Sequence, residues 1–318
     1  MTTFAAWVEK LRPYLQIARV DHWFKNIFIL PGMIAVIVFE PETKSWDNVP
    51  FAFLALLASC LIASSNYVIN EILDARTDRF HPSKKSRPAV SGKVNLALAY
   101  GEWLGLALCG LGVGAFVSGA FVLTLAGFWG MGIVYNVPPL RSKEVPYLDV
   151  LSEAINNPIR LLLGWFGMKG TMFPPSSLLM AYWLIGAYLM TAKRFAEYRE
   201  IGDPEKAGSY RSSFRFYTEA KLATTMLAYA SGFMFFVGVI LVKYHVEFIL
   251  ACPLLMVYLA YYSGLAYKED SVAQNPEKLY RDRTLMGLTI ALAVVLWVLA
   301  FAEFPALGVW LGIEGRGW

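Results

Sequence analysis

The chain has 318 residues, of which 57% are hydrophobic and only 16% charged, with a mean hydropathy of +0.48. Soluble domains carry about 25% charged residues, so this composition excludes an ordinary soluble protein and indicates an integral membrane protein. The net charge of +4 is modest and gives no reason to expect a nucleic-acid partner.

The N-terminal segment, residues 1–26, is interrupted by charges and by Pro13, and it carries Trp7 and Trp23. We interpret it as an amphipathic helix lying in the membrane interface. Residues 27–318 are predicted to form a single all-α domain of about nine transmembrane helices. The predicted spans are about residues 27–39, 51–74, 96–119, 120–137, 147–168, 177–198, 222–242, 248–267 and 285–309.

Lysine and arginine are concentrated in alternate loops, those that follow the second, fourth, sixth and eighth predicted spans. The loops between them carry at most one lysine each. By the positive-inside rule, the basic loops and the N-terminus face the cytoplasm. The sequence therefore predicts a multi-pass protein of the cytoplasmic membrane, with a helical bundle around a polar cavity that opens to the cytoplasmic side.

The most informative stretch is the end of the second predicted span. Asn70, Asp74 and Asp78 recur every four residues, which places them on one face of a helix. Clustered carboxylates attract Mg²⁺, and Lys84 and Arg87, which follow, are suited to binding phosphate. The alternative is a solvated helix end, but carboxylates inside a membrane are costly and usually functional. The pattern suggests a site for a metal-bound diphosphate.

A second polar stripe lies on the fifth predicted span. Its members share one helical face if the helix is continuous, and they are Asp149, Glu153, Asn156 and Arg160. Pro158 is expected to kink this helix. The stripe either lines the cavity or forms a buried structural network between the carboxylates and Arg160.

Further charged residues are expected on the same membrane side. Lys193, Arg194 and Glu197 close the sixth predicted span, and Arg211 follows in its loop. Several cations beside an acidic site suit a substrate with more than one phosphate, although Lys193 and Glu197 could simply pair with each other. The remaining candidates, which carry a weaker signal, are Lys25, Asn26 and Arg281.

The run from Asn70 and Glu71 through Asp74, Asp78 and Arg87 to Gly92 resembles the first aspartate-rich motif of the UbiA superfamily of intramembrane prenyltransferases. The usual pattern has aspartate where this chain has Glu71. The resemblance covers nearly the whole chain. It implies that Asn70, Asp74 and Asp78 hold Mg²⁺ and that Asp74 and Asp78 act in catalysis.

The second motif departs from the common pattern, because the aspartates expected after the sixth span are replaced by Lys193, Arg194 and Glu197. This makes the chain similar to the decaprenyl-phosphate phosphoribosyltransferase branch. That branch moves phosphoribose from phosphoribosyl pyrophosphate (PRPP) to a polyprenyl phosphate and feeds the synthesis of arabinose donors for the cell envelope. The resemblance implies Asp149 as a further catalytic residue and the following substrate-binding residues: Lys25, Asn26, Lys84, Arg87, Arg160, Lys193, Arg194, Glu197, Arg211 and Arg281.

Two alternatives stay open. One is transfer of a prenyl group from an allylic diphosphate to an aromatic or other acceptor, which would use the same Mg²⁺ site. The other is a lipid transporter without catalytic activity, because polar cavities near helix breaks also serve transport. The lipid chain length and a homo-oligomeric state are not settled by the sequence.

Overall fold

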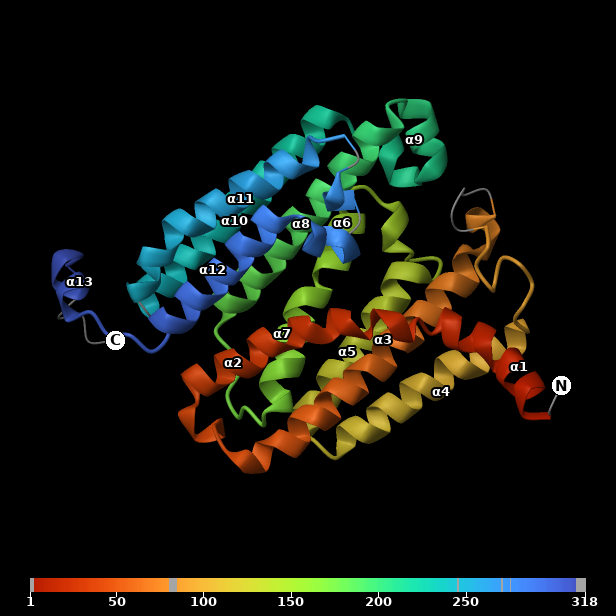
Figure 1. Ribbon diagram of the computed structural model, residues 1–318, viewed down its shortest axis with the longest axis horizontal. Helices are drawn as coiled ribbons and strands as arrows, with labels where there is room; N and C mark the ends of the chain where they lie inside the picture. The colour runs from red at the N-terminus through yellow and green to blue at the C-terminus, as the bar shows by residue number, and fades with distance from the viewer. Residues whose placement is uncertain (1–2, 80–84, 245, 270, 275, 313–318) are drawn as a thin grey trace. The chain divides into compact units, whose positions relative to one another are not determined.

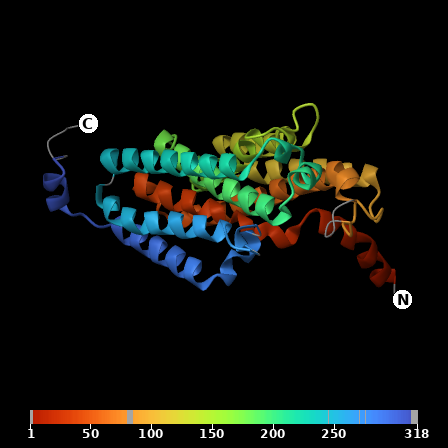
Figure 2. The same ribbon diagram turned by 90° about the horizontal axis from the view of Figure 1, so that it is seen from above.

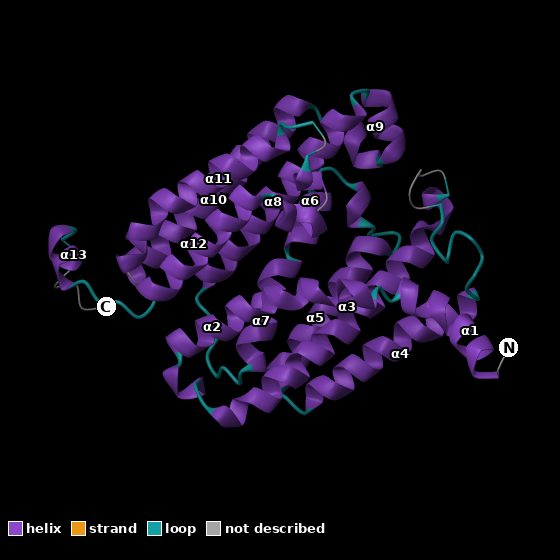
Figure 3. Ribbon diagram, viewed as in Figure 1, coloured by secondary structure: helices purple, strands orange, loops and turns teal. Residues whose placement is uncertain are grey.

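The structure is a computed structural model that describes residues 3–79, 85–244, 246–269, 271–274 and 276–312 (Figure 1). Within these residues the chain forms helices and loops and contains no strand (Figure 3). It divides into two compact units, Met1–Pro174 and Pro175–Trp318. The all-helical fold class is confirmed.

Unit 1 contains seven α-helices among its described residues. They are α1 (Thr3–Ile17), α2 (Leu30–Phe39), α3 (Val49–Asp78), α4 (Leu96–Ala115), α5 (Gly119–Asn136), α6 (Leu148–Ala154) and α7 (Asn156–Gly167). Short 3₁₀ helices include η1 (Val20–Ile29), which joins α1 to α2, and η4 (Ser142–Glu144), which precedes α6. The long helix α3 packs against α4, α5 and α7 and is therefore the centre of this unit.

The core of unit 1 is apolar and consists of residues from α2, α3, α5 and α7, with Val36, Ile62, Phe121 and Trp165 among the buried members. Gly132 lets α5 approach α3 closely, since a Cβ atom there would lie 2.0 Å from the Asn66 side-chain oxygen. This close approach brings the end of α5 beside the polar face of α3.

Unit 2 contains α8 (Ser176–Ile201), α9 (Pro204–Tyr210), α10 (Glu219–Lys243), α11 (Cys252–Ala266), α12 (Arg283–Leu299) and α13 (Pro305–Trp310). α8 and α10 lie side by side in both ribbon views (Figures 1 and 2). The 3₁₀ helices η5 (Ser212–Arg215) and η8 (Pro276–Arg281) precede α10 and α12.

Six stretches in the described part of the chain are long and apolar enough to cross a membrane. They are Glu9–Phe39, Trp46–Asp78, Leu96–Ala115, Gly119–Asn136, Glu219–Lys243 and Val246–Ala266. The membrane character is thereby confirmed, whereas the count of nine spans stays a prediction. The division into an interfacial segment, residues 1–26, and one domain, residues 27–318, likewise stays a prediction.

Two predicted spans are not continuous helices. The fifth is divided at Ile155 between α6 and α7, because Pro158 has no N–H to continue the helical hydrogen bonds. The ninth ends at Leu299, and Pro305 begins the separate helix α13. The kink expected at Pro158 is thus present, and the polar residues of 149–160 belong to two helices; the single face expected for them stays a prediction.

Candidate functional site

The polar face of α3 meets two cations from the loop that follows α5. The Lys143 ammonium nitrogen lies 2.5 Å from Asp74 Oδ1, and Arg141 Nη2 lies 3.1 Å from the same oxygen. Both basic side chains are largely buried, with 10% and 17% of their surface exposed. Asp74 is thus held near the C-terminal end of α3 by two largely buried cations.

Asn136 at the end of α5 connects Lys143 to Asn70. Its Oδ1 accepts a hydrogen bond from Asn70 Nδ2 at 2.5 Å and another from Lys143 Nζ at 2.9 Å. Its own amide nitrogen donates to the Gly132 carbonyl oxygen. Asn70, Asp74, Asn136, Arg141 and Lys143 form a single connected set, which we call the α3 polar group.

The α3 polar group keeps two oxygens available to a metal ion. The hydrogen bonds and ion pairs of Asn70 and Asp74 leave Asn70 Oδ1 and Asp74 Oδ2 without a protein partner in the described structure. The two residues are one helical turn apart on the same face. Protein sites for Mg²⁺ commonly supply only one or two carboxylates, with water and substrate phosphate completing the shell. The donor chemistry therefore fits Mg²⁺, although no ready-made group of three His, Cys, Asp or Glu ligands exists among the described residues.

Asp78 continues the face towards the loop and forms an ion pair with Arg87. The carboxylate is buried and the guanidinium is about three-quarters buried. Arg87 is thus held beside the α3 polar group, as a phosphate-binding residue requires. Lys84, also predicted to bind phosphate, lies outside the described residues.

The helices α6 and α7 direct two of their polar residues towards α5. Asp149, at the start of α6, is fully buried. The Glu153 carboxylate accepts a hydrogen bond from the Tyr135 hydroxyl at 2.9 Å, and the Lys143 ammonium lies 5.9 Å from the centre of the Tyr135 ring. The Arg160 guanidinium lies 5.1 Å from the Phe128 ring. Glu153 is therefore joined through Tyr135 to the α3 polar group.

Lys25 and Asn26 lie on η1. The Lys25 ammonium is 3.3 Å from His22 Nδ1. Asn26 is buried, its amide nitrogen donating to the Cys60 sulfur, and its side-chain oxygen has no hydrogen-bond partner in the described structure. Asn26 thus fixes η1 onto α3, a structural contact that the sequence did not reveal.

Unit 2 holds the remaining candidates, most of them around Glu197. Arg194 is 2% exposed and lies 3.1 Å from the Glu197 carboxylate, and Lys193 lies 3.9 Å from it. The charge of Arg211 also acts on Glu197. Three cations thus surround one carboxylate, and we call these four residues the α8 cation group. Arg281 is exposed at the end of η8 and lies apart from them in the sequence.

The sequence analysis did not identify Asn136, Arg141 and Lys143 as site residues, and it counted the two basic residues only as topology signals. A detectable signal was their place directly after Pro138 and Pro139, in a loop on the same predicted side as the α3 carboxylates. Arg141 also has a left-handed backbone conformation, with φ 26°. Such strain costs about 1–3 kcal/mol and tends to occur at functional sites.

Comparison with known proteins agrees with this geometry. A model described as the UbiA prenyltransferase family matches residues 28–282. The chain belongs to the UbiA prenyltransferase family. It is accordingly a multi-pass membrane protein of that family.

Two curated relatives are similar to this chain in sequence, and one solved structure is similar to it in fold. The chain is 26% identical over 209 residues to the decaprenyl-phosphate phosphoribosyltransferase of Mycolicibacterium smegmatis, covering 65% of this chain and 63% of the relative. It is 30% identical over 211 residues to the nodulation protein NoeC of Azorhizobium caulinodans, covering 64% of each. The chain thus spans less than two thirds of the length of these relatives.

The fold is similar to that of a UbiA homologue from Archaeoglobus fulgidus bound to GPP and Mg²⁺. The TM-score is 0.68 at 18% sequence identity, covering 91% of this chain and 100% of the other. At this level of identity the similarity establishes the fold.

Proposed function

We propose that the protein transfers 5-phosphoribose from PRPP to a polyprenyl phosphate in the cell membrane. The observation that carries this proposal is the α8 cation group, in which Lys193, Arg194 and Arg211 surround Glu197. Its net positive charge suits a phosphate better than a metal ion. PRPP carries two separate phosphate-bearing groups, a diphosphate and a 5-phosphate, so its binding requires several cationic contacts.

The α3 polar group is proposed to bind the diphosphate. Asn70, Asp74 and Asp78 would hold Mg²⁺, which when bound neutralises negative charge on the diphosphate. Arg141 and Lys143, which both contact Asp74 Oδ1, add fixed positive charges. Such preorganised charges stabilise a leaving group without reorganising during the reaction.

The reaction forms one bond and breaks another. An oxygen of the lipid phosphate attacks C1 of the ribose while the bond from C1 to the diphosphate oxygen breaks, and the diphosphate leaves with the electron pair. The attacking oxygen is already anionic, so the step requires no general base. The chain's contribution is to position the two anions and to offset the charge that grows on the departing diphosphate.

The similarity to the decaprenyl-phosphate phosphoribosyltransferase of Mycolicibacterium smegmatis supports this assignment. With the N-terminus in the cytoplasm, as the distribution of basic residues predicts, the α3 polar group faces the compartment that supplies a water-soluble sugar phosphate. The product would then serve the synthesis of arabinose donors for the cell envelope.

Purified protein incubated with Mg²⁺, decaprenyl phosphate and PRPP labelled in the ribose tests this proposal. We expect the label to enter the lipid phase and one diphosphate to be released for each lipid formed. A folded preparation that leaves the lipid unlabelled, and instead consumes labelled geranyl diphosphate, would establish prenyl transfer in its place.

Prenyl transfer is the second candidate, because the family is named for it and the α3 polar group would serve an allylic diphosphate equally well. The replacement of the second acidic run by the α8 cation group argues against it. A non-catalytic transporter is not retained, since the family is one of transferases.

A further inference from the structure

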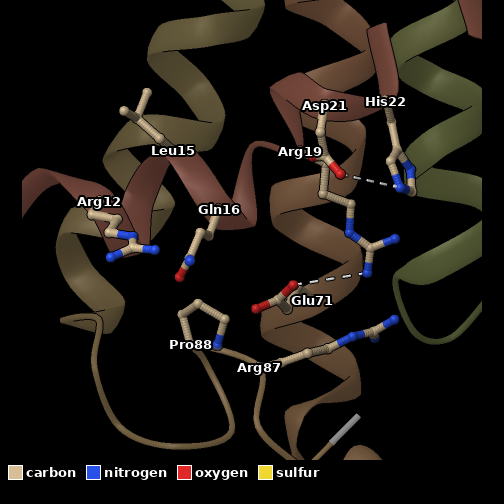
Figure 4. A pocket seen from close by; sticks show the side chains of 9 residues that line it. All are labelled: Arg12, Leu15, Gln16, Arg19, Asp21, His22, Glu71, Arg87 and Pro88. Atoms are coloured by element: carbon tan, nitrogen blue, oxygen red, sulfur yellow. Dashed lines mark ion pairs between the residues drawn. The ribbon is translucent and has the colours of Figure 1, made fainter. Parts of the chain in front are cut away.

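A second cavity lies next to the α3 polar group, around the end of α3. It has a volume of about 590 Å³ and is formed by α1, η1, the end of α3 and the segment at Arg87 and Pro88 (Figure 4). Glu71, which lines it, follows Asn70 in the sequence and is therefore turned by about 100° around the helix axis. We call this space the N-terminal cavity.

Arg19 projects into the N-terminal cavity with most of its donors unused. Its guanidinium lies 3.8 Å from the Glu71 carboxylate, too far for a hydrogen bond, and 5.4 Å from the centre of the Tyr67 ring. No hydrogen bond of this side chain occurs in the described structure, although it is only 19% exposed. A largely buried guanidinium with free N–H groups beside a cavity is suited to binding an anion.

The backbone at Arg19 has an unusual conformation. Arg19 has φ 48° and ψ 51°, a left-handed conformation that ends α1 and begins η1. Residues other than glycine rarely adopt this conformation, and when they do it often accompanies function. Ile17 and Ala18, just before it, are buried against α3 and α4 and hold the turn in place.

Two further arginines line the same cavity. Figure 4 shows Glu71 between Arg12 on one side and Arg19 and Arg87 on the other. Arg12 is exposed and has no hydrogen bond or ion pair in the described structure. Because Glu71 already accepts a hydrogen bond from the Ala89 N–H, its carboxylate is partly satisfied. Because Arg87 is paired with Asp78, the guanidinium groups of this cavity that are left to bind an anion are those of Arg12 and Arg19.

The cavity adjoins an exposed apolar surface. Leu15 on its rim is 61% exposed, and Val20 and Phe24 on η1 are 40% and 57% exposed. These residues belong to Glu9–Phe39, one of the stretches apolar enough to enter a membrane. An anion-binding cavity next to such a surface matches an amphiphile with a phosphate headgroup and hydrocarbon chains.

We propose that the N-terminal cavity binds the phosphate headgroup of an anionic membrane lipid, with Arg12 and Arg19 as its phosphate ligands. The lipid chains lie along Leu15, Val20 and Phe24. A lipid such as phosphatidylglycerol fits best, since its glycerol hydroxyls can donate hydrogen bonds to Glu71 while its phosphate accepts from the arginines. This site is distinct from the α3 polar group and does not depend on the reaction that the enzyme catalyses.

Native mass spectrometry of the full chain in detergent tests the proposal. Equal amounts of phosphatidylglycerol and phosphatidylcholine with identical acyl chains are added, and the lipid retained by the protein is counted. A basic residue near a membrane surface contributes about fivefold to anionic lipid binding. We expect the wild type to retain phosphatidylglycerol preferentially, R12Q to lower that retention about fivefold, and R12Q/R19Q about 25-fold.

The matched control is K10Q, which removes the same charge from an exposed position on the same helix. We expect it to retain phosphatidylglycerol within about twofold of the wild type, because Lys10 does not line the N-terminal cavity. Arg12 is exposed and without partners in the described structure, so R12Q keeps the fold. This variant alone therefore tests the lipid site even if the double variant does not fold.

Three results would overturn the proposal. One is undiminished phosphatidylglycerol retention in R12Q, and another is an equal loss in K10Q, which would indicate diffuse charge rather than a site. The third is displacement of the lipid by millimolar inorganic phosphate, which would make free phosphate the ligand.

Discussion

Replacing Lys143 with methionine removes a buried positive charge from the α3 polar group and shortens the unbranched side chain by one heavy atom. The ammonium contacts Asp74 Oδ1 at 2.5 Å and Asn136 Oδ1 at 2.9 Å. Arg141 still pairs with Asp74 in the variant, so the carboxylate keeps one positively charged partner. The variant therefore separates the contribution of one cation from that of the whole group.

The expected magnitudes differ for stability and for activity. A hydrogen bond to a charged group contributes about 1.5–3 kcal/mol, and because Arg141 remains, we expect the free energy of unfolding to fall by about 2 kcal/mol. If the ammonium stabilises the departing diphosphate, its removal resembles the loss of one preorganised donor, which lowers kcat about 10²–10³-fold.

The assay is the initial rate of lipid labelling from PRPP at saturating and limiting PRPP, so that kcat and KM are obtained separately. K169M is the matched control, because Lys169 is exposed and stacks on Phe51 in the same unit; its kcat should stay within about twofold of the wild type. A folded K143M variant that retains wild-type kcat would refute the role given to Lys143.

Three further outcomes are expected. D74N should abolish labelling, since it removes the charge of the metal-binding carboxylate, and should also lower Tm, because Arg141 and Lys143 lose their carboxylate partner. Labelling at the wild-type rate by the folded variant would exclude a metal role for Asp74. Chelation with EDTA should stop turnover, and added Mg²⁺ should restore it, without unfolding; activity that persists in EDTA would contradict the metal site. G132A should lower the free energy of unfolding by about 1–3 kcal/mol through overpacking, because its Cβ would meet Asn66. G127A is the control and should not lower it, since a Cβ there has nothing within 4 Å. Equal Tm values for the two variants would argue against the close approach of α3 and α5.

The α3 face was predictable because its information is local. Asn70, Asp74 and Asp78 recur at the helical period, and the apolar length before them indicates a membrane helix. These two observations predict a membrane helix with its polar residues on one face, without any knowledge of how the helices pack.

The partners of that face were not predictable, because they come from distant parts of the chain. Lys143 reaches Asp74 across 69 positions, and the turn that allows this includes the left-handed residue Arg141. Nothing in a helical periodicity specifies such a loop contact. The same reason explains Asn26, whose burial on Cys60 depends on the packing of η1 against α3.

The break in the stripe of residues 149–160 was predictable from one residue. The chain divides at Ile155, between Glu153 on α6 and Arg160 on α7. Pro158 was a sufficient warning, since proline removes an interior helical hydrogen bond. A proline inside a periodic polar pattern therefore warrants treating the two halves as separate elements.

The most direct test of the account is the position of a metal ion bound to the protein together with PRPP. A crystal or electron microscopy structure with Mn²⁺ in place of Mg²⁺ would locate it. The account predicts that Asn70 Oδ1 and Asp74 Oδ2 coordinate the ion and that Lys143 contacts the diphosphate. An ion bound elsewhere, with both Asp74 oxygens turned away from it, would contradict the account.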